Sequence, residues 1–365
     1  MTPNPLIGVF FHWLGGLASA SFYVPYKRIK LWSWEIFWLT GGIFSWLIAP
    51  WIFAYFQTSD LFGVLGGASP SVWFWCVFWG VMWGFGGLTF GLTMRYLGLS
   101  LGMAVALGLT TVIGTLGEPI FTGKIVQLAQ TLSGQVTLFG VLVVLGGIVL
   151  VARAGHNKEK EVTEVSESLK EFNLTKGIMV AIFCGVMSSC FAFGLAAGAP
   201  VREASAAAGT GPLWVGLPVL CMVLLGGLTT NLIWSGYLIL KNKSASEWLG
   251  KPKPGAEEVF GEGKAAKIPL LTNYLLAALG GTLWYFQFFF YTMGESQMGE
   301  YGFSSWTLHM ASIILFSTLW GFALKEWAGT SVKTRALVWG GIATLVGSTV
   351  IIGIGNMLAG QVAGH

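Results

Sequence analysis

The chain has 365 residues, of which 54% are hydrophobic and only 10% are charged, whereas roughly a quarter of the residues are charged in a typical soluble domain. This composition excludes a soluble globular protein and indicates an integral membrane protein without a sizeable soluble domain. The net charge of +4 comes from basic residues placed beside apolar segments, so it does not indicate nucleic-acid binding.

Ten predominantly apolar segments follow one another along the chain, each close to the roughly 20 residues that one helical crossing of a bilayer needs. They cover residues 5–25, 34–56, 71–93, 97–118, 134–152, 177–198, 213–239, 269–291, 304–323 and 336–357. The sequence therefore predicts an all-α integral membrane protein with ten transmembrane helices. The first segment resembles a signal peptide, but its basic cluster follows the apolar run, so we expect an uncleaved first span.

The basic residues predict the orientation. All of them except Lys124 and Arg202 fall in the loops after the first, third, fifth, seventh and ninth apolar segments. Because loops rich in lysine and arginine stay in the cytoplasm, these loops should be cytoplasmic and both termini should face outward.

The chain divides into two halves of five segments. We expect a first five-helix repeat over residues 1–153, a charged cytoplasmic linker over 154–176 and a second five-helix repeat over 177–365. Since five is odd, the halves must face opposite ways, which is the inverted-repeat arrangement of many secondary transporters. A short similarity between residues 16–22 and 185–191, GLASASF and GVMSSCF, supports a duplication.

Four ionisable residues lie within or at the ends of apolar segments: His12, Glu35, Glu118 and His309. A charge inside a bilayer is costly, so such residues are seldom idle. Histidine has the unperturbed proton affinity nearest neutrality, which makes His12 and His309 proton-coupling candidates, with Glu118 as a third. The alternative is a neutral histidine ring hydrogen-bonded between helices. For Glu35 and Glu118, a solvated carboxylate at the membrane interface is favoured.

An aromatic run, GGTLWYFQFFFYTMG at residues 280–294, contains one uncharged amide, that of Gln287. At helical spacing Trp284, Gln287 and Tyr291 share a stripe, which suits a neutral polyol because aromatic faces pack on sugar C–H groups and the amide bonds hydroxyls. The alternative is an interfacial aromatic belt with an amide bonding a neighbouring helix. The predicted substrate-binding residues are His12, Trp284, Gln287, Tyr291, His309 and Asn231.

Glycine is abundant, and Gly80, Gly84, Gly87 and Gly91 form a stripe on the third segment. Small residues at this spacing let helices approach closely inside a bilayer.

Several strings resemble the bacterial L-rhamnose-proton symporters, a branch of the drug/metabolite transporter superfamily. They are FYVPYK at 22–27, GLTMRYLGLSLG at 91–102, EFNL at 171–174, WYFQFFFY at 284–291, SWTLHM at 305–310 and LKEW at 324–327. Their order extends the resemblance over nearly the whole chain.

The resemblance implies a multi-pass protein of the bacterial inner membrane with ten helices in two inverted five-helix repeats. It implies import of L-rhamnose, or a closely related 6-deoxyhexose, by proton symport, with both termini periplasmic. His12, the aromatic run and His309 lie in matching segments, whereas the family pattern requires no carboxylate at Glu118. The expected partners are the sugar and the lipid bilayer, with no cofactor beyond the coupling proton, no bound metal, no nucleic acid and no obligate protein partner.

Three alternatives stay open. A sodium-coupled sugar symporter could hold its ion with backbone carbonyls and hydroxyls that leave no motif. A metabolite exporter would use the same architecture, because sequence does not set the direction of transport. A membrane-embedded enzyme is a different class, and against it stands the lack of a zinc-protease motif, a nucleophile elbow or paired carboxylates within a segment.

Overall fold

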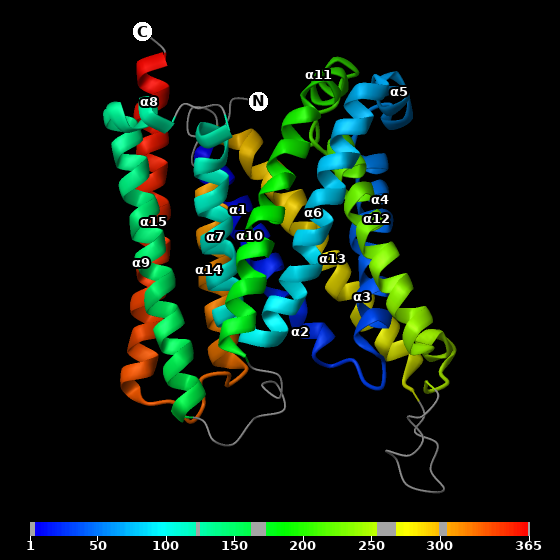
Figure 1. Cartoon of the computed structure of the whole chain (residues 1–365). Coiled ribbons are helices and arrows are strands. Elements are labelled where there is room, and N and C mark those ends of the chain that lie inside the picture. Colours follow the sequence, from blue (N-terminus) through cyan, green and yellow to red (C-terminus); the bar gives the residue numbers. More distant parts are fainter. Residues whose placement is uncertain (1–3, 122–124, 162–172, 254–267, 299–304, 364–365) are drawn as a thin grey trace, which may run out of the picture. The chain divides into compact units, whose positions relative to one another are not determined.

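The computed structural model describes residues 4–121, 125–161, 173–253, 268–298 and 305–363, and within these ranges the chain forms helices and no strand (Figure 1). The helices are α1 (Pro5–Ser21), α2 (Tyr23–Tyr26), α3 (Trp34–Ile43), the π-helical turn η1 (Phe44–Ile48), α4 (Ala49–Gln57), α5 (Leu61–Gly67), α6 (Pro70–Leu97), α7 (Leu99–Phe121), α8 (Ile125–Gln130), α9 (Leu132–Glu161), α10 (Leu174–Ala197), α11 (Ala199–Ala207), α12 (Leu217–Asn242), the 3-10 turn η3 (Ser244–Leu249), α13 (Leu270–Gln297), α14 (Ser305–Ala323) and α15 (Val332–Ala363). Each predicted apolar segment coincides with one or more of these helices.

Seven helical segments among the described residues are long and apolar enough to cross a bilayer. The described part of α7 and helix α14 contribute shorter apolar stretches, whereas α13 is 28 residues long but carries Trp284, Tyr285 and Gln287, which lower its hydropathy. The expectation of an all-helical, multi-pass membrane protein is confirmed at this level.

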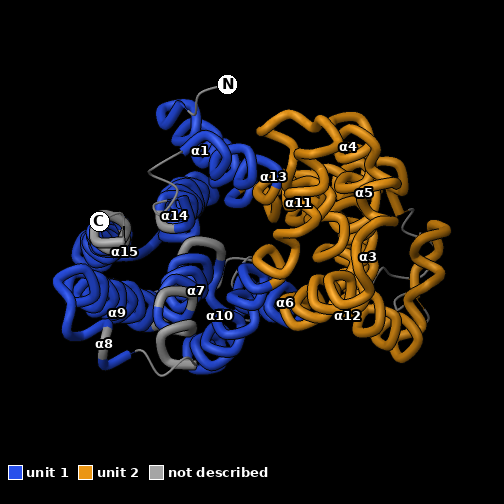
Figure 2. The backbone as a smooth tube through the Cα atoms, turned by 90° about the horizontal axis from the view of Figure 1, so that it is seen from above, with its two compact units in different colours: residues 1–20, 85–193, 289–365 blue, residues 21–84, 194–288 orange. Residues whose placement is uncertain are grey.

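The chain forms two compact units, and each draws on both halves of the sequence (Figure 2). Unit 1 contains residues 1–20, 85–193 and 289–365, and unit 2 contains residues 21–84 and 194–288. Helices α6, α10 and α13 therefore contribute to both units. The predicted repeats describe the order of helices along the chain, which is a different division. Most of the predicted linker, 162–172, lies outside the described residues, while α9 runs on into its first part.

Within unit 1, α9 and α15 pack against each other along their lengths. Glycines make this possible: a Cβ on Gly140 would lie 2.6 Å from Ile352 Cγ1, and a Cβ on Gly147 would lie 2.8 Å from Leu345 Cγ. Inside a bilayer there is no hydrophobic driving force for two helices to associate, so this close van der Waals contact is what stabilises the pair.

The last residue of α9, Glu161, ties this pair together at one end. Its carboxylate accepts hydrogen bonds from Ser331 N at 2.7 Å, Ser331 Oγ at 2.8 Å and Thr334 Oγ1 at 2.8 Å, at the exposed start of α15. A negative charge there also interacts favourably with the positive end of the helix dipole. The hydrogen bond from the Ser331 backbone, followed by those from Thr334 and Ser331 side chains, lowers the pKa of Glu161.

Within unit 2, α12 packs against α3, η1 and α4, and it meets α6 at the predicted glycine stripe. A Cβ on Gly80 would collide with the backbone carbonyl of Val223, and one on Gly84 would lie 2.7 Å from Thr230 Cβ. Close packing is thus confirmed for these two glycines. A Cβ on Gly87 would meet nothing within 4 Å, so the stripe serves this contact only over its first part.

The second apolar segment is interrupted by η1. A π-turn shifts the backbone hydrogen bonds from i→i−4 to i→i−5, and here Ala49 N bonds to Phe44 O. Pro50 follows directly at the start of α4, and proline has no N–H to bond the carbonyl four residues before it, that of Trp46. The π-turn is a local adjustment of the kind that lets a membrane helix accommodate a proline.

Glu35 is buried, and its Oε1 accepts hydrogen bonds from Asn242 Nδ2 at 2.8 Å and Ser244 Oγ at 2.9 Å. The expectation of a solvated interfacial carboxylate is therefore wrong for Glu35. All three residues belong to unit 2, and the carboxylate fastens the start of α3 to the end of α12 and the start of η3.

Candidate functional site

Helix α1 of unit 1 buries a face made of small and polar residues. Its buried positions include Gly8, His12, Gly15, Gly16 and Ser19, which recur at helical spacing. Larger apolar side chains, such as those of Leu6 and Phe10, are exposed. This division aims the His12 imidazole into the protein, where none of its surface is accessible.

Three rings meet at this face. The His12 ring lies 5.5 Å from the Tyr291 ring and 5.9 Å from the His309 ring, and Tyr291 lies 5.3 Å from His309, between ring centroids. They come from α1, the end of α13 and α14, all within unit 1. The structure thus brings together three of the residues predicted to bind substrate, from parts of the chain about 300 positions apart.

Glycine backbones allow the helices to approach this closely. A Cβ on Gly294 would lie 2.8 Å from His12 Nε2, so the imidazole rests on bare backbone of α13. A Cβ on Gly16 would collide with Ser312 Oγ, so the backbone of α1 lies directly against the small Ser312 side chain of α14. These two glycines therefore allow α13 and α14 to lie close to α1 at the cluster.

The hydrogen bonds of the two histidines are incomplete. The His12 backbone carbonyl accepts from the His309 ring and from Ser312 Oγ, the latter at 3.1 Å. Both ring nitrogens of His12 and Nδ1 of His309 are buried without a partner. An unpaired buried polar atom costs about 1–3 kcal/mol, and a neutral imidazole offers one donor and one acceptor. These atoms are therefore placed to bind a proton or a hydroxyl group.

The same geometry limits how many protons the pair can hold. Two imidazolium rings 5.9 Å apart would repel each other by about 3 kcal/mol at an effective dielectric constant of about 20. The arrangement is consequently suited to one proton held by the pair rather than one on each ring.

The remaining predicted sugar-binding residues belong to unit 2. Trp284 and Gln287 are buried on α13. Asn231 on α12 is fully buried, accepts a hydrogen bond from Trp38 Nε1 at 2.9 Å and donates to the Gly227 carbonyl at 2.7 Å. Both ends of the Asn231 amide are thus engaged within the protein.

Glu118 lies in helix α7, but its side chain is outside the described residues.

A small cavity in unit 2 is lined mostly by residues that the sequence analysis did not predict to bind substrate. Its volume is about 10 Å³, which is the size of one water molecule. Its lining residues come from α2, α3, η1 and α13 and the residue before α2: Phe22, Tyr26, Trp38, Gly42, Ser45, Trp46 and Trp284. We call these residues the aromatic cage. Trp284 is the one member predicted from the sequence.

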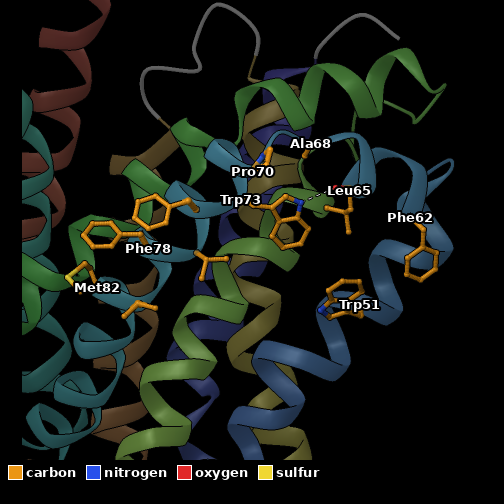
Figure 3. Close-up of a pocket in the computed structure, with 12 residues that line it drawn as sticks. Trp51, Phe62, Leu65, Ala68, Pro70, Trp73, Phe78 and Met82 are labelled. Atoms are coloured by element: carbon orange, nitrogen blue, oxygen red, sulfur yellow. Dashed lines mark hydrogen bonds between the residues drawn. The ribbon is translucent and has the colours of Figure 1, made fainter.

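A much larger cavity of about 1040 Å³ opens elsewhere in unit 2, beside α4, α5 and the start of α6 (Figure 3). Its labelled lining includes Trp51, Phe62, Phe78 and Met82, and the Trp73 indole is turned to the Leu65 carbonyl, to which it donates at 3.0 Å. Because the lining is almost entirely apolar, this cavity offers few partners for the hydroxyl groups of a polar ligand.

Comparison with known proteins bears on the whole chain. The family model described as L-rhamnose-proton symport protein (RhaT) matches residues 1–359. The chain is 38% identical over 350 residues to proteins named L-rhamnose-proton symporter from Citrobacter koseri and Shigella sonnei, covering 96% of this chain and 97% of each relative. A relative of the same name from Klebsiella pneumoniae is 37% identical over the same shares.

Proposed function

The chain belongs to the L-rhamnose-proton symporter family, and from this premise we propose that it imports L-rhamnose together with protons across the bacterial inner membrane. The observation that carries the proposal is the buried pair His12 and His309, with Tyr291 against both rings. The family match over residues 1–359 supplies the substrate and the coupling ion, and the pair supplies a place for the proton.

We further propose ten membrane crossings, with both termini in the periplasm and two inverted repeats over residues 1–153 and 177–365. The coincidence of every predicted apolar segment with a helix supports the number of crossings. The basic loops support the orientation, and within unit 1 the start of α1 and the end of α15 lie at the same end (Figure 1), as an even number of crossings requires.

In the proposed mechanism, His12 and His309 share one proton and Tyr291 packs between them and the sugar. Protonation converts a ring nitrogen from an acceptor to a donor, which changes the sugar hydroxyl that it can hold. Binding of the proton and binding of the sugar then favour each other. Trp284, Gln287 and Asn231 stay predicted sugar-binding residues of unit 2, and Glu118 stays a third proton-coupling candidate.

Transport follows from alternating access. A ligand shifts a conformational equilibrium only by its difference in affinity for the two states. The proton and the sugar together must therefore bind the closing state more tightly than the outward-open state, while either alone shifts the equilibrium too little. This requirement couples the two fluxes without a chemical reaction, which is why we assign no enzymatic activity.

The test is calorimetric binding of L-rhamnose to the purified full-length protein between pH 5 and 8, with sodium present or absent. The proposal predicts saturable, stereospecific binding that depends on pH and not on sodium. Sodium-dependent binding at constant pH would contradict proton coupling, and a wild-type protein that binds no L-rhamnose at any of these pH values would contradict the substrate.

A further inference from the structure

We propose that the aromatic cage of unit 2 binds one hydroxyl group of the transported sugar, with Ser45 and Trp46 as its hydrogen-bonding partners and Trp284 as an apolar wall. This inference rests on the proposed function, because it names residues that recognise the same substrate. It also adds Ser45 and Trp46, which the sequence pattern did not indicate.

The rings of the cage enclose the cavity from several directions. Trp284 lies 4.1 Å from Phe22 between centroids, at 65°. Trp38 lies 6.2 Å from Tyr26 and 6.3 Å from Trp46, both at steep angles. Aromatic faces of this kind pack against the C–H groups of a sugar ring, while the space between them accepts only a small polar group.

Two polar atoms in this apolar surround have no partner. Ser45 is 1% exposed and Trp46 is 2% exposed, and neither Ser45 Oγ nor Trp46 Nε1 makes a hydrogen bond. A buried helical hydroxyl usually bonds a carbonyl of its own helix, as Thr40 Oγ1 does with Ile36 O at 2.7 Å. The Trp46 N–H is a hydrogen-bond donor, and the Ser45 hydroxyl is both a donor and an acceptor. Together at one cavity they can bond a single alcohol group, which itself donates and accepts.

The π-turn η1 explains why these two side chains reach the cavity. A π-turn widens the helix locally and changes the direction of the side chains it carries, and such turns occur often at functional sites. The Trp46 ring also folds over Gly42, where a Cβ would collide with it. Pro50, which has no backbone N–H, follows the turn directly at the start of α4.

A hydrogen bond from outside the cage fixes the position of the Trp38 ring. Its Nε1 donates to Asn231 Oδ1 at 2.9 Å, and Asn231 Nδ2 is itself anchored on the Gly227 carbonyl. Besides its predicted role in sugar binding, Asn231 therefore orients the cage through Trp38.

The volume of about 10 Å³ sets the size of the group that the cage takes. One hydroxyl occupies about the space of one water molecule, whereas a whole hexose does not fit without separation of the rings. The cage is therefore a slot for one hydroxyl, and it favours sugars that present that hydroxyl beside an apolar C–H face. A sugar without it leaves Ser45 and Trp46 unpaired and loses affinity.

The experiment measures binding of L-rhamnose and its monodeoxy analogues to the purified full-length protein and to Ser45→Ala and Trp46→Phe. Ser45→Ala removes the hydroxyl group alone, and Trp46→Phe removes the indole N–H together with part of the ring, a loss of volume that the control Trp51→Phe shares. We expect each to weaken L-rhamnose binding roughly fivefold to tenfold, as loss of one neutral hydrogen bond does. One monodeoxy analogue should bind the wild type with a similar loss and should bind the variants with no further loss.

Ser235→Ala and Trp51→Phe are matched controls. Ser235 Oγ and Trp51 Nε1 are also buried without a partner in unit 2, but neither lines the cage, so both variants should bind L-rhamnose as the wild type does. Thermal unfolding of all four variants identifies any that lose affinity through misfolding.

The outcomes separate the two proposals. If the wild type binds L-rhamnose and neither cage variant differs from its control, the cage proposal is overturned and the proposed function stands. If the wild type binds another monosaccharide instead, the substrate is overturned, and the cage is judged on that sugar with the same variants. If the wild type binds no monosaccharide, both proposals are overturned.

Discussion

The separation of His12 and His309 predicts that one proton, and not two, accompanies each sugar. Two charged imidazoles 5.9 Å apart would repel each other by about 3 kcal/mol at an effective dielectric constant of about 20. Each factor of ten in an equilibrium constant is about 1.4 kcal/mol, so double protonation is disfavoured by a factor on the order of 100 relative to independent sites.

The assay is a reversal experiment in proteoliposomes with the membrane potential held at zero. For one proton per sugar, a pH difference of one unit should be balanced by a tenfold opposing sugar gradient; two protons would require a hundredfold gradient, because each pH unit adds about 1.4 kcal/mol per proton. We expect net sugar flux to vanish at the tenfold gradient. The double variant His12→Gln/His309→Gln should show no response to the pH difference at all.

Two results would refute the reasoning. Balance at a hundredfold gradient would show that the pair does not act as a single proton site. A double variant that still balances a pH difference with a tenfold gradient would place the proton on another group. Ser235→Ala, in unit 2, serves as the control for the effect of substitution itself.

Three further predictions concern other parts of the two units. Glu161→Gln should lower the thermal stability at neutral pH. The hydrogen bonds from Ser331 and Thr334 lower the pKa of the Glu161 carboxyl, so its contribution to stability is present above the ordinary carboxyl pKa and is lost as the pH falls through the lowered one. Unfolding measured across pH checks this, and a difference between variant and wild type that persists after the carboxyl is protonated would contradict it. Gly294→Ala should destabilise the protein by about 1–3 kcal/mol, because the added methyl group overpacks against the His12 ring. The melting temperature and L-rhamnose uptake should both be reduced; unchanged values would show that α13 can move away from His12. Asn231→Leu leaves the Trp38 N–H without a hydrogen-bond acceptor, which should lower the free energy of unfolding by about 1–3 kcal/mol. It should also change the fluorescence emission of buried tryptophan. An unaltered emission spectrum and melting temperature would show that Trp38 finds another partner.

The sequence predicted those features that depend on local periodicity. The small and polar face of α1 follows from residues at helical spacing, so the burial of His12 was foreseeable from Gly8, Gly15 and Ser19. The membrane class follows from composition in the same way. The sequence analysis included His12, Tyr291 and His309 among the predicted substrate-binding residues, but spacing along separate helices does not determine which helices touch.

The remaining features depend on contacts between distant segments. The aromatic cage joins parts of the chain from Phe22 to Trp284, and no spacing rule connects them. Pro50 could have signalled an irregular turn, but which side chains it redirects is visible only when Ser45 and Trp46 are seen in the helix. Glu35 was misjudged because its partners lie more than 200 positions away. The two compact units likewise combine pieces of both predicted repeats, because packing follows adjacency in space.

The central claim is that sugar and proton enter together. The most direct measurement is the external pH of de-energised cells, or of proteoliposomes with a pH electrode outside, when L-rhamnose is added without sodium. The account predicts a transient alkalinisation that L-rhamnose elicits and its enantiomer does not, with loss of the signal in the His12→Gln/His309→Gln variant. Entry of L-rhamnose without a pH change, or only when sodium is present, would contradict the account.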